Sequence, residues 1–475
     1  MEPLARAHAL QALEAIVGAR HLLRDDAEQA PFLTDQRRLF TGRAIAIALP
    51  QSTDEVSRLL SYCFERRIPV VPQGGNTGYC GGATPSAQGD ALLIGLQRLN
   101  RIRSTSASND SLVAEAGCTL ASVQAAARAA ERLFPLSLGS EGSCQIGGNL
   151  STNAGGVHVL RYGTARALML GLEVVLPDGR VLSSLDGLRK DTRGYALDQC
   201  FVGAEGTLGI ITAACLRLFP LPRSTAAALV AVRDIAAALA LLDGLRGMLG
   251  EQLTAFEAMP RLAIELAVEH LDAARDPFDR AYPWVVLCEA SSTEDGTKLD
   301  AALENTLAAA STDGIVLDAA LARSEAQRIG FWFLREHIPE AQRLSGGSIK
   351  HDIALPRDRL VAFYETAAAW VAGNVPEARL CAYGHLGDGN LHFNLNQAPG
   401  TGRDAFLARE PIVQRAIHDL VAAHGGTFSA EHGIGQLKVR ELERYRTPQQ
   451  IQTMRALKQA LDPRGIMNPG KVLPP

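Results

Sequence analysis

The glycine-rich segment Pro72-Gln-Gly-Gly-Asn-Thr-Gly-Tyr-Cys-Gly-Gly-Ala-Thr-Pro85 follows a short apolar run, Val70-Val71, that we predict to be a strand. Five of its residues between Gly74 and Gly82 are glycines. Because glycine has no Cβ, a loop of this kind exposes successive backbone N–H groups and lets the chain pass close to a pyrophosphate. Taken alone, the segment fits an ordinary surface loop equally well.

Two further glycine loops favour a dinucleotide site. The loop Gly139-Ser-Glu-Gly-Ser-Cys-Gln-Ile-Gly-Gly-Asn149 runs into Ser151-Thr-Asn-Ala-Gly-Gly156, and Gly203-Ala-Glu-Gly-Thr-Leu-Gly-Ile210 precedes a predicted strand. No Gly-x-Gly-x-x-Gly lies between a predicted strand and a predicted helix, so a Rossmann site for NAD is not supported.

Local sequence patterns divide the chain into two regions with different arrangements of predicted elements. To about residue 220, glycine loops alternate with short predicted elements, which are strands at 44–49, 171–176, 180–182 and 209–217 and a helix at 53–66. Pro177-Asp178-Gly179 predicts a hairpin turn. From residue 226 to about 382, predicted helices at 235–248, 299–310 and 360–371 alternate with strands such as 284–289, which is typical of an α+β domain.

A pair of histidines lies in Gly384-His-Leu-Gly-Asp-Gly-Asn-Leu-His-Phe-Asn-Leu-Asn396. If Asp388-Gly389 forms a two-residue hairpin turn, His385 lies directly opposite His392 with Cβ atoms about 5 Å apart. That spacing suits a shared metal ion. The period of a strand also puts Asn394 on the same face, and Leu391, Phe393 and Leu395 on the face toward a core. For the pair alone, hydrogen-bonded structural histidines are the simpler interpretation.

The segment Ser429-Ala-Glu-His-Gly-Ile-Gly435 adds a carboxylate, Glu431, and a third imidazole, His432, inside a glycine-bracketed turn. By itself it fits a solvated loop. Two imidazoles and one carboxylate that leave open coordination positions suit a catalytic zinc site, and manganese or cobalt accepts the same ligand types.

Bulk properties narrow the class of protein. The 475 residues, 47% of them hydrophobic, suffice for two or three packed domains, and the net charge of −4 without a long basic run argues against nucleic acid as a partner. Eight cysteines without a Cys-x-x-Cys pair indicate reduced thiols and a cytoplasmic location. Charged residues interrupt the apolar pattern of residues 1–23 and 226–242, so we expect neither a signal peptide nor a transmembrane segment.

Together, these segments resemble the vanillyl-alcohol-oxidase-like FAD fold, and more narrowly its branch of D-lactate, glycolate and D-2-hydroxyglutarate dehydrogenases. The resemblance runs from about Arg37 to the C-terminus. It implies an α+β protein with a PCMH-type FAD-binding domain at residues 1–220 and a substrate (cap) domain of FAD-linked oxidase type, with the metal hairpin, at 221–428. A C-terminal segment, 429–475, would pack on the FAD and the active site.

The resemblance also implies which residues hold FAD. Relatives with covalently bound flavin have a histidine in the first loop, where this chain has Asn76 and Thr77, so we expect noncovalent FAD. Thr192-Arg193 departs from the family's usual Asn-Thr, so no flavin contact is assigned to it. The implied FAD-binding residues are Pro72, Gly74, Gly75, Asn76, Thr77, Gly78, Gly81, Gly82, Gly139, Ser140, Ser143, Gly147, Gly148, Asn149, Asn153, Ala154, Gly155, Gly156, Gly206, Gly209, Ile210 and Asn468.

By the same resemblance, the metal ligands are His385, His392 and Glu431, and the catalytic base is His432. The predicted reaction is the oxidation of a D-2-hydroxy acid to the 2-oxo acid. The metal would bind the α-hydroxyl and the carboxylate, His432 would remove the hydroxyl proton, and hydride would pass from C2 to flavin N5.

Two segments bear on the substrate. Phe331-Trp-Phe-Leu-Arg-Glu-His-Ile-Pro-Glu340 resembles the helix that supplies a substrate arginine, here Arg335, and Ser348-Ile-Lys-His-Asp-Ile-Ala-Leu-Pro356 resembles the strand with a substrate lysine, here Lys350. Two cations fit a substrate with a second carboxylate, so D-2-hydroxyglutarate is expected first, and D-malate, D-lactate or glycolate next.

Neighbouring positions leave part of this assignment open. Asn394 would add a hydrogen bond to the carboxylate, whereas Pro339 stands where the family has a threonine donor. The alternative for Arg335 is a surface ion pair with Glu336 or Glu340.

Partners and competing classes complete the expectations. The reduced flavin would pass its electrons to an electron-transfer flavoprotein, a quinone or a cytochrome, and the oligomeric state stays open, with a homodimer among the alternatives. A zinc metallohydrolase would use the histidines without needing the glycine loops. A non-catalytic flavoprotein would bind FAD but would not be bleached by D-2-hydroxy acids.

Overall fold

The computed structural model describes residues 3–474, which form two compact units. The first unit contains residues 3–155, 164–221 and 431–474, and the second contains residues 156–163 and 222–430. No sequence signal indicated that residues 156–163 belong to the second unit. Among the described residues, no helix is both long and apolar enough to cross a bilayer, and no disulfide joins any of the eight cysteines.

The first unit contains a four-stranded sheet in the order β1-β2-β4-β3, in which β2, β4 and β3 run parallel. Its strands are β1 (Leu22–Leu23), β2 (Ala46–Ala48), β4 (Leu92–Gly95) and β3 (Val70–Gln73). Between β2 and β3 lies α3 (Thr53–Arg66), with the bounds that the sequence predicts. The Ser52 side chain caps its start by accepting from the Glu55 N–H, and Arg67 ends it in the left-handed conformation.

A second, antiparallel sheet of the first unit has the order β5-β6-β10-β8-β9. Its strands are β5 (Ile102–Ser106), β6 (Ser111–Glu115), β10 (Ile210–Arg217), β8 (Met169–Val175) and β9 (Val181–Ser183). The predicted hairpin between β8 and β9 is confirmed, with Gly179 at φ +90° in the turn. A two-stranded ribbon pairs β7 (Arg132–Leu133) with β11 (Phe219–Pro220).

The other helices of the first unit are α1 (Pro3–Val17), α2 (Asp26–Leu33), α4 (Leu120–Ala129), α5 (Ile146–Ser151), α15 (Val439–Tyr445) and α16 (Pro448–Leu461).

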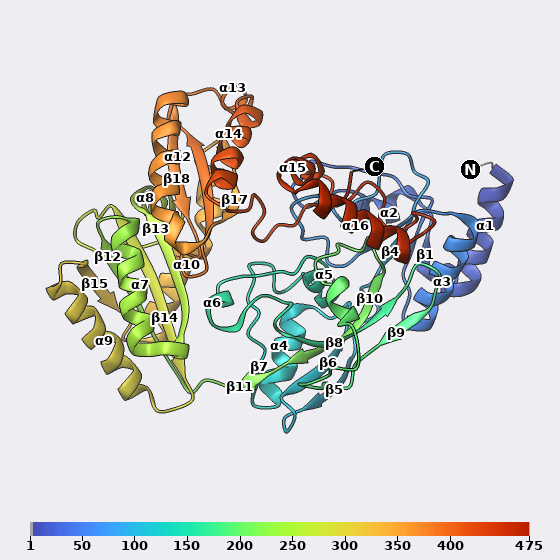
Figure 1. Cartoon of the computed structure of the whole chain (residues 1–475), viewed down its shortest axis with the longest axis horizontal. Coiled ribbons are helices and arrows are strands. Elements are labelled where there is room, and N and C mark those ends of the chain that lie inside the picture. The colour runs from blue at the N-terminus through green and yellow to red at the C-terminus, as the bar shows by residue number, and fades with distance from the viewer. Residues whose placement is uncertain (1–2, 475) are drawn as a thin grey trace. The chain divides into compact units, whose positions relative to one another are not determined.

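The second unit is built on two sheets (Figure 1). One has the order β13-β14-β12-β15, and its strands are β13 (Leu253–Pro260), β14 (Trp284–Ser292), β12 (Ser224–Val232) and β15 (Val316–Leu321). In the other, β16 (Ser348–Ile349), β17 (Asp352–Ala354) and β18 (Ala378–Tyr383) all pair with β19 (Asn390–Gln397).

Helices cover both faces of the first of these sheets. Apolar side chains of α7 (Ile235–Leu249) and α9 (Gly296–Thr312) pack on one face, and those of α8 (Arg261–His270), α10 (Glu325–Glu336) and α11 (Ile338–Leu344) pack on the other. The second sheet packs its apolar side chains against α12 (Leu360–Asn374) and α14 (Glu410–Ala423), and the remaining α-helices of the unit are α6 (Val159–Tyr162) and α13 (Arg403–Leu407).

The last part of the chain is tied into the first unit by two sets of hydrogen bonds. The backbone of residues 466–468 brackets Val70 of β3, whose N–H donates to the Ile466 carbonyl and whose carbonyl accepts from the Asn468 N–H, both at 2.8 Å. The carboxylate of Glu205 accepts from the backbone N–H groups of Ile434 and Gly435, each at 2.7 Å. Glu205 therefore holds the turn after His432 against the loop that precedes β10.

Glu205→Gln should loosen this turn, because an amide offers one acceptor oxygen and presents a donor to the second N–H group. A hydrogen bond to a charged group contributes about 1.5–3 kcal/mol, so we expect the amides of Ile434 and Gly435 to exchange hydrogen roughly 10- to 100-fold faster. Hydrogen–deuterium exchange of the intact protein measures this. Glu443→Gln, on the exposed side of α15, is the matched control, and unchanged protection in Glu205→Gln contradicts the assignment.

Candidate active site and metal centre

The hairpin that carries the two histidines exists, but its predicted register is wrong. His392 pairs with Tyr383 rather than with His385, so residues 384–389 form a longer loop in place of a two-residue turn. The reason lies at Gly384, whose N–H and carbonyl bond to Ala258 of β13 at 3.0 and 2.9 Å. Because these backbone groups pair with the other sheet, the hairpin cannot close at Asp388.

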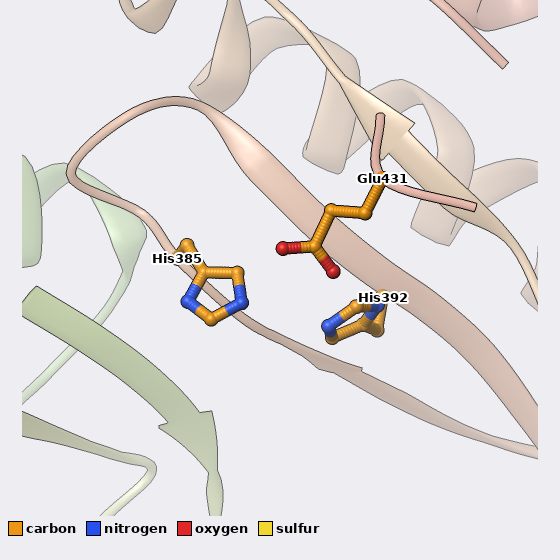
Figure 2. Close-up of side chains that lie close together, drawn as sticks. All are labelled: His385, His392 and Glu431. Atoms are coloured by element: carbon orange, nitrogen blue, oxygen red, sulfur yellow. The ribbon is translucent and has the colours of Figure 1, made fainter. Parts of the chain in front are cut away.

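The two imidazoles nevertheless converge. The ring centroids of His385 and His392 lie 5.7 Å apart, with the rings nearly perpendicular. Potential ligand atoms of His385, His392 and Glu431 all lie within 4.8 Å of one another, and Figure 2 shows the three side chains directed toward a common point. Two imidazoles and one carboxylate at this spacing are a donor set that fits a divalent cation such as zinc.

Glu431 reaches this cluster because the chain just before it pairs with β17. Thr427 and Ala354 exchange backbone hydrogen bonds of 2.7 and 3.1 Å, and the Ala430 N–H donates to the Asp352 carbonyl at 3.3 Å. β17 in turn pairs with β19, so a strand-like segment carries the carboxylate to the histidine on β19.

A buried glutamate that the sequence analysis missed supports His385. The Nδ1 atom of His385 lies 2.7 Å from Oε1 of Glu257, and Nε of Arg335 donates to Oε2 of Glu257 at 2.8 Å. Burial raises the pKa of Glu257, but the attraction of His385 and Arg335 outweighs it and lowers the pKa to about 2. With Nδ1 engaged by a carboxylate, Nε2 is the nitrogen of His385 that would coordinate a metal.

Glu257 had one sequence signal, a lone acidic residue in the otherwise apolar run Ala255-Phe-Glu-Ala-Met259. In a strand with both faces buried, a charged side chain requires a partner in the interior, so an acidic residue at this position indicates a buried cation or histidine beside it.

Arg335 does not lie on the surface, so the predicted alternative of an ion pair with Glu336 or Glu340 is wrong. Only 6% of the residue is exposed, and its guanidinium carbon lies 5.0 Å from the centre of the Tyr383 ring. Within the described chain its Nη2 atom is buried without a hydrogen-bond partner. A buried donor that lacks a protein partner is suited to an anionic ligand.

The other two predicted substrate residues differ in their surroundings. Asn394 lies two residues beyond His392 on β19, and its amide is engaged at both ends, because Oδ1 accepts from the His351 N–H at 3.1 Å and Nδ2 donates to Gln342 at 3.0 Å. Lys350 is exposed, between β16 and β17. Their contacts with substrate stay predictions.

In the first unit, the glycines of the predicted FAD loops fall into two kinds. At some, another chain segment passes so close that a Cβ would collide, as at Gly75 with the Ser143 carbonyl oxygen at 2.0 Å and at Gly206 with Pro72 at 2.4 Å. At Gly78, Gly139 and Gly148 a Cβ would meet no atom within 4 Å. The first kind lets the loops pack together, and the second leaves bare backbone facing open space, which fits a dinucleotide.

Buried polar atoms in the same loops also fit a bound cofactor. Oδ1 of Asn468 and Oε1 of Gln145 are buried and have no partner among the described residues. The Asn468 amide nitrogen donates to the carbonyls of Gly82 and Glu205, so the side chain lies between the first and third loops, and its contact with FAD stays a prediction. The His432 ring lies edge-on against Tyr79 of the first loop, with centroids 4.7 Å apart.

Comparison with known proteins shows the two kinds of domain that the resemblance implies. Residues 44–184 match the family model of an FAD binding domain, and residues 221–472 match that of the C-terminal domain of FAD linked oxidases. Among solved structures, p-cresol methylhydroxylase is similar with a TM-score of 0.77 at 15% identity, over 99% of this chain and 97% of the other. Alkyldihydroxyacetonephosphate synthase is similar with a TM-score of 0.73 at 17% identity, over 98% and 84%. At these identities the likeness shows the fold, which is the predicted PCMH-type fold.

Sequence relatives are more specific. The mitochondrial D-2-hydroxyglutarate dehydrogenase of Bos taurus is 40% identical over 98% of this chain and 83% of its own length. That of Arabidopsis thaliana is 37% identical, over 97% and 80%. The D-2-hydroxyglutarate dehydrogenase of Xanthomonas citri pv. viticola is 34% identical, over 97% and 96%. The chain therefore belongs to the family of FAD-dependent D-2-hydroxyacid dehydrogenases.

Proposed function

We propose that this protein oxidises D-2-hydroxyglutarate to 2-oxoglutarate and that His385, His392 and Glu431 hold a divalent metal ion. Zinc is the first candidate for this ion. The observation that carries the proposal is the buried guanidinium of Arg335, which shares the Glu257 carboxylate with His385. The proposed metal ligand His385 and the Arg335 guanidinium, which has an unpartnered N–H group, thus lie on either side of Glu257. Each would bind one of the two carboxylate-bearing ends of the substrate. The names of the relatives point to the same substrate.

The glycine loops would hold the FAD noncovalently through backbone N–H groups, and the buried oxygens of Gln145 and Asn468 would accept from it. When bound, FAD supplies the N5 atom that accepts hydride from C2 of the substrate.

His385 and His392 would present ring nitrogens to the metal, with Glu257 orienting the ring of His385. Oδ1 of Asp352 lies 4.0 Å from Nδ1 of His392, which is too far for a hydrogen bond, so His392 has no counterpart of the Glu257 contact at that carboxylate oxygen. When bound, the metal would lower the pKa of the substrate hydroxyl and so ease loss of its proton.

His432 would take that proton. A neutral imidazole is a competent base near pH 7, because its ordinary pKa is about 6.5. It follows Glu431 directly in the chain, and the hydrogen bonds of Glu205 to Ile434 and Gly435 hold the turn that it begins.

Substrate selection would rest on Arg335, with Lys350 and Asn394 contributing. The distal carboxylate of D-2-hydroxyglutarate would accept from the guanidinium group, whereas D-lactate and glycolate have no second carboxylate. D-malate has one, on a shorter chain, and is the second candidate. The electron acceptor and a cytoplasmic location stay predictions, and the oligomeric state stays open. The names of several relatives place those proteins in mitochondria.

The flavin of the as-purified protein should be bleached by D-2-hydroxyglutarate under anaerobic conditions, more slowly by D-lactate, and not by the L-enantiomers. After dialysis against a chelator the bleaching should be lost, and added Zn²⁺ should restore it. Flavin absorbance measures both. Full bleaching of protein shown to be free of metal would contradict the role of the metal.

His432→Ala should lower kcat for D-2-hydroxyglutarate roughly 10²- to 10⁴-fold, which is the usual contribution of a general base. Flavin and metal contents, measured on the same sample, should not change. His270→Ala, at the end of α8, serves as the control. A loss of less than threefold would rule out His432 as the base.

Arg335→Lys should lower kcat/KM for D-2-hydroxyglutarate roughly 10- to 100-fold, because lysine keeps the charge beside Glu257 but loses the planar fork that binds a carboxylate. Steady-state kinetics should show the loss mainly in KM, with kcat/KM for D-lactate within about threefold. Arg328→Lys, two turns earlier on α10, is the matched control. Equal losses on the two substrates would argue for a structural role of Arg335.

A further inference from the structure

Two buried carboxylates on one face of a sheet hold helix α10 in the second unit. Glu257 on β13 and Glu289 on β14 lie on the same face, because Glu257 pairs with Leu287 and side chains two residues apart point the same way. Glu289 accepts from Arg328 at 3.0 Å and from the Trp332 indole at 2.7 Å.

Glu257 binds Arg335, which lies on the same face of α10 because it is seven residues beyond Arg328. Both glutamates therefore anchor α10, and this role is common to them.

Glu257 has a second partner that Glu289 does not share. Its Oε2 accepts from Arg335 at 2.8 Å, and its Oε1 lies 2.7 Å from Nδ1 of His385. None of the Glu257 residue is exposed, so water does not compete for either oxygen. The next residue in β13, Ala258, binds the backbone of Gly384, directly before His385. The separation of His385 from Arg335 is thus set by one side chain on a rigid strand.

Each bond of Glu257 also determines which atoms its partner presents. Nδ1 of His385 is engaged, so Nε2 is the nitrogen that would coordinate the metal. Nε of Arg335 is engaged, and the buried Nη2 atom is left without a hydrogen-bond partner among the described residues. One carboxylate therefore orients two groups that, in the proposed function, bind opposite ends of the substrate.

We infer that Glu257 is a positioning residue that sets the spacing between the metal centre and Arg335, and thereby selects 2-hydroxy acids that carry a second carboxylate. The inference rests on the proposed function, because it takes His385 as a metal ligand and Arg335 as a carboxylate-binding residue. It assigns the selection to a residue that does not itself touch the substrate.

Glu257→Gln is the main test, because it keeps the shape of the side chain but can accept at only one end. Zn²⁺ affinity is measured on the flavin-containing protein, stripped of metal, by competition with a chromophoric chelator. The ratio of kcat/KM for D-2-hydroxyglutarate to that for D-lactate is measured at saturating Zn²⁺. We expect the Kd for Zn²⁺ to rise roughly 10- to 100-fold, the usual effect of losing a carboxylate behind a histidine ligand. The ratio should fall about tenfold or more, mainly through KM for D-2-hydroxyglutarate.

Glu289→Gln is the matched control, since it weakens the same sheet–helix contact without touching His385 or Arg335. Its Zn²⁺ affinity and substrate ratio should stay within about threefold of wild type. Equal changes in the two variants would overturn the inference, because both would then reflect the packing of α10. Wild-type values in Glu257→Gln would overturn it as well.

Glu257→Asp covers the case in which the glutamine variant does not fold. It keeps the charge but is one methylene shorter, so it cannot span both partners. Smaller changes in the same direction are expected, and wild-type values for both quantities would overturn the inference.

Wild-type protein separates this test from that of the proposed function. Failure to bind Zn²⁺ or to oxidise D-2-hydroxyglutarate in wild type would contradict the proposed function and, with it, the inference. Zn²⁺-dependent oxidation that is unaffected by Glu257→Gln would leave the proposed function standing and overturn the inference alone.

Discussion

The backbone pairing between Ala258 and Gly384 is the constraint on which the candidate site of the second unit depends. It joins β13 of one sheet to the end of β18 in the other. Because Gly384 bonds to Ala258, the hairpin opens into a loop and His385 leaves the register of β19. The same pairing brings Glu257, the neighbour of Ala258, beside His385. The residue at this crossing must be glycine, because a Cβ on Gly384 would lie 2.8 Å from the Asn390 carbonyl oxygen. Gly384 can therefore pair with the other sheet while the chain turns back toward β19.

A buried ionised carboxylate is costly unless the interior supplies partners, and a buried ion pair by itself is weak evidence of stability. Glu257 satisfies both of its oxygens with His385 and Arg335, which keep its pKa low despite burial. Apolar residues of similar volume would hold α10 to the sheet at no such cost. The reason for a charge at this position is therefore more readily found in the orientation of its partners than in the stability of the unit.

Glycine serves two physical purposes in the first unit. At Gly75 and Gly206 it lets loops from distant parts of the chain pass in contact, and at Gly78 and Gly139 it leaves backbone uncovered. The close crossings fix the paths of these loops, and the uncovered stretches are where we propose that the FAD binds. The C-terminal residues complete this unit because Asn468 bonds to two of the loops.

Much of the protein followed from local pattern. The glycine loops, helix α3, the β8–β9 hairpin and the residue types of the cluster of His385, His392 and Glu431 could be predicted, since spacing, turn residues and donor chemistry are properties of short segments. The resemblance carried by those segments also led to the family. Three things depended on tertiary structure: the register around His385, the burial of Arg335 and the role of Glu257. Each is decided by a backbone or side-chain contact between strands and helices far apart in the chain, and such contacts leave no periodic signal in the sequence.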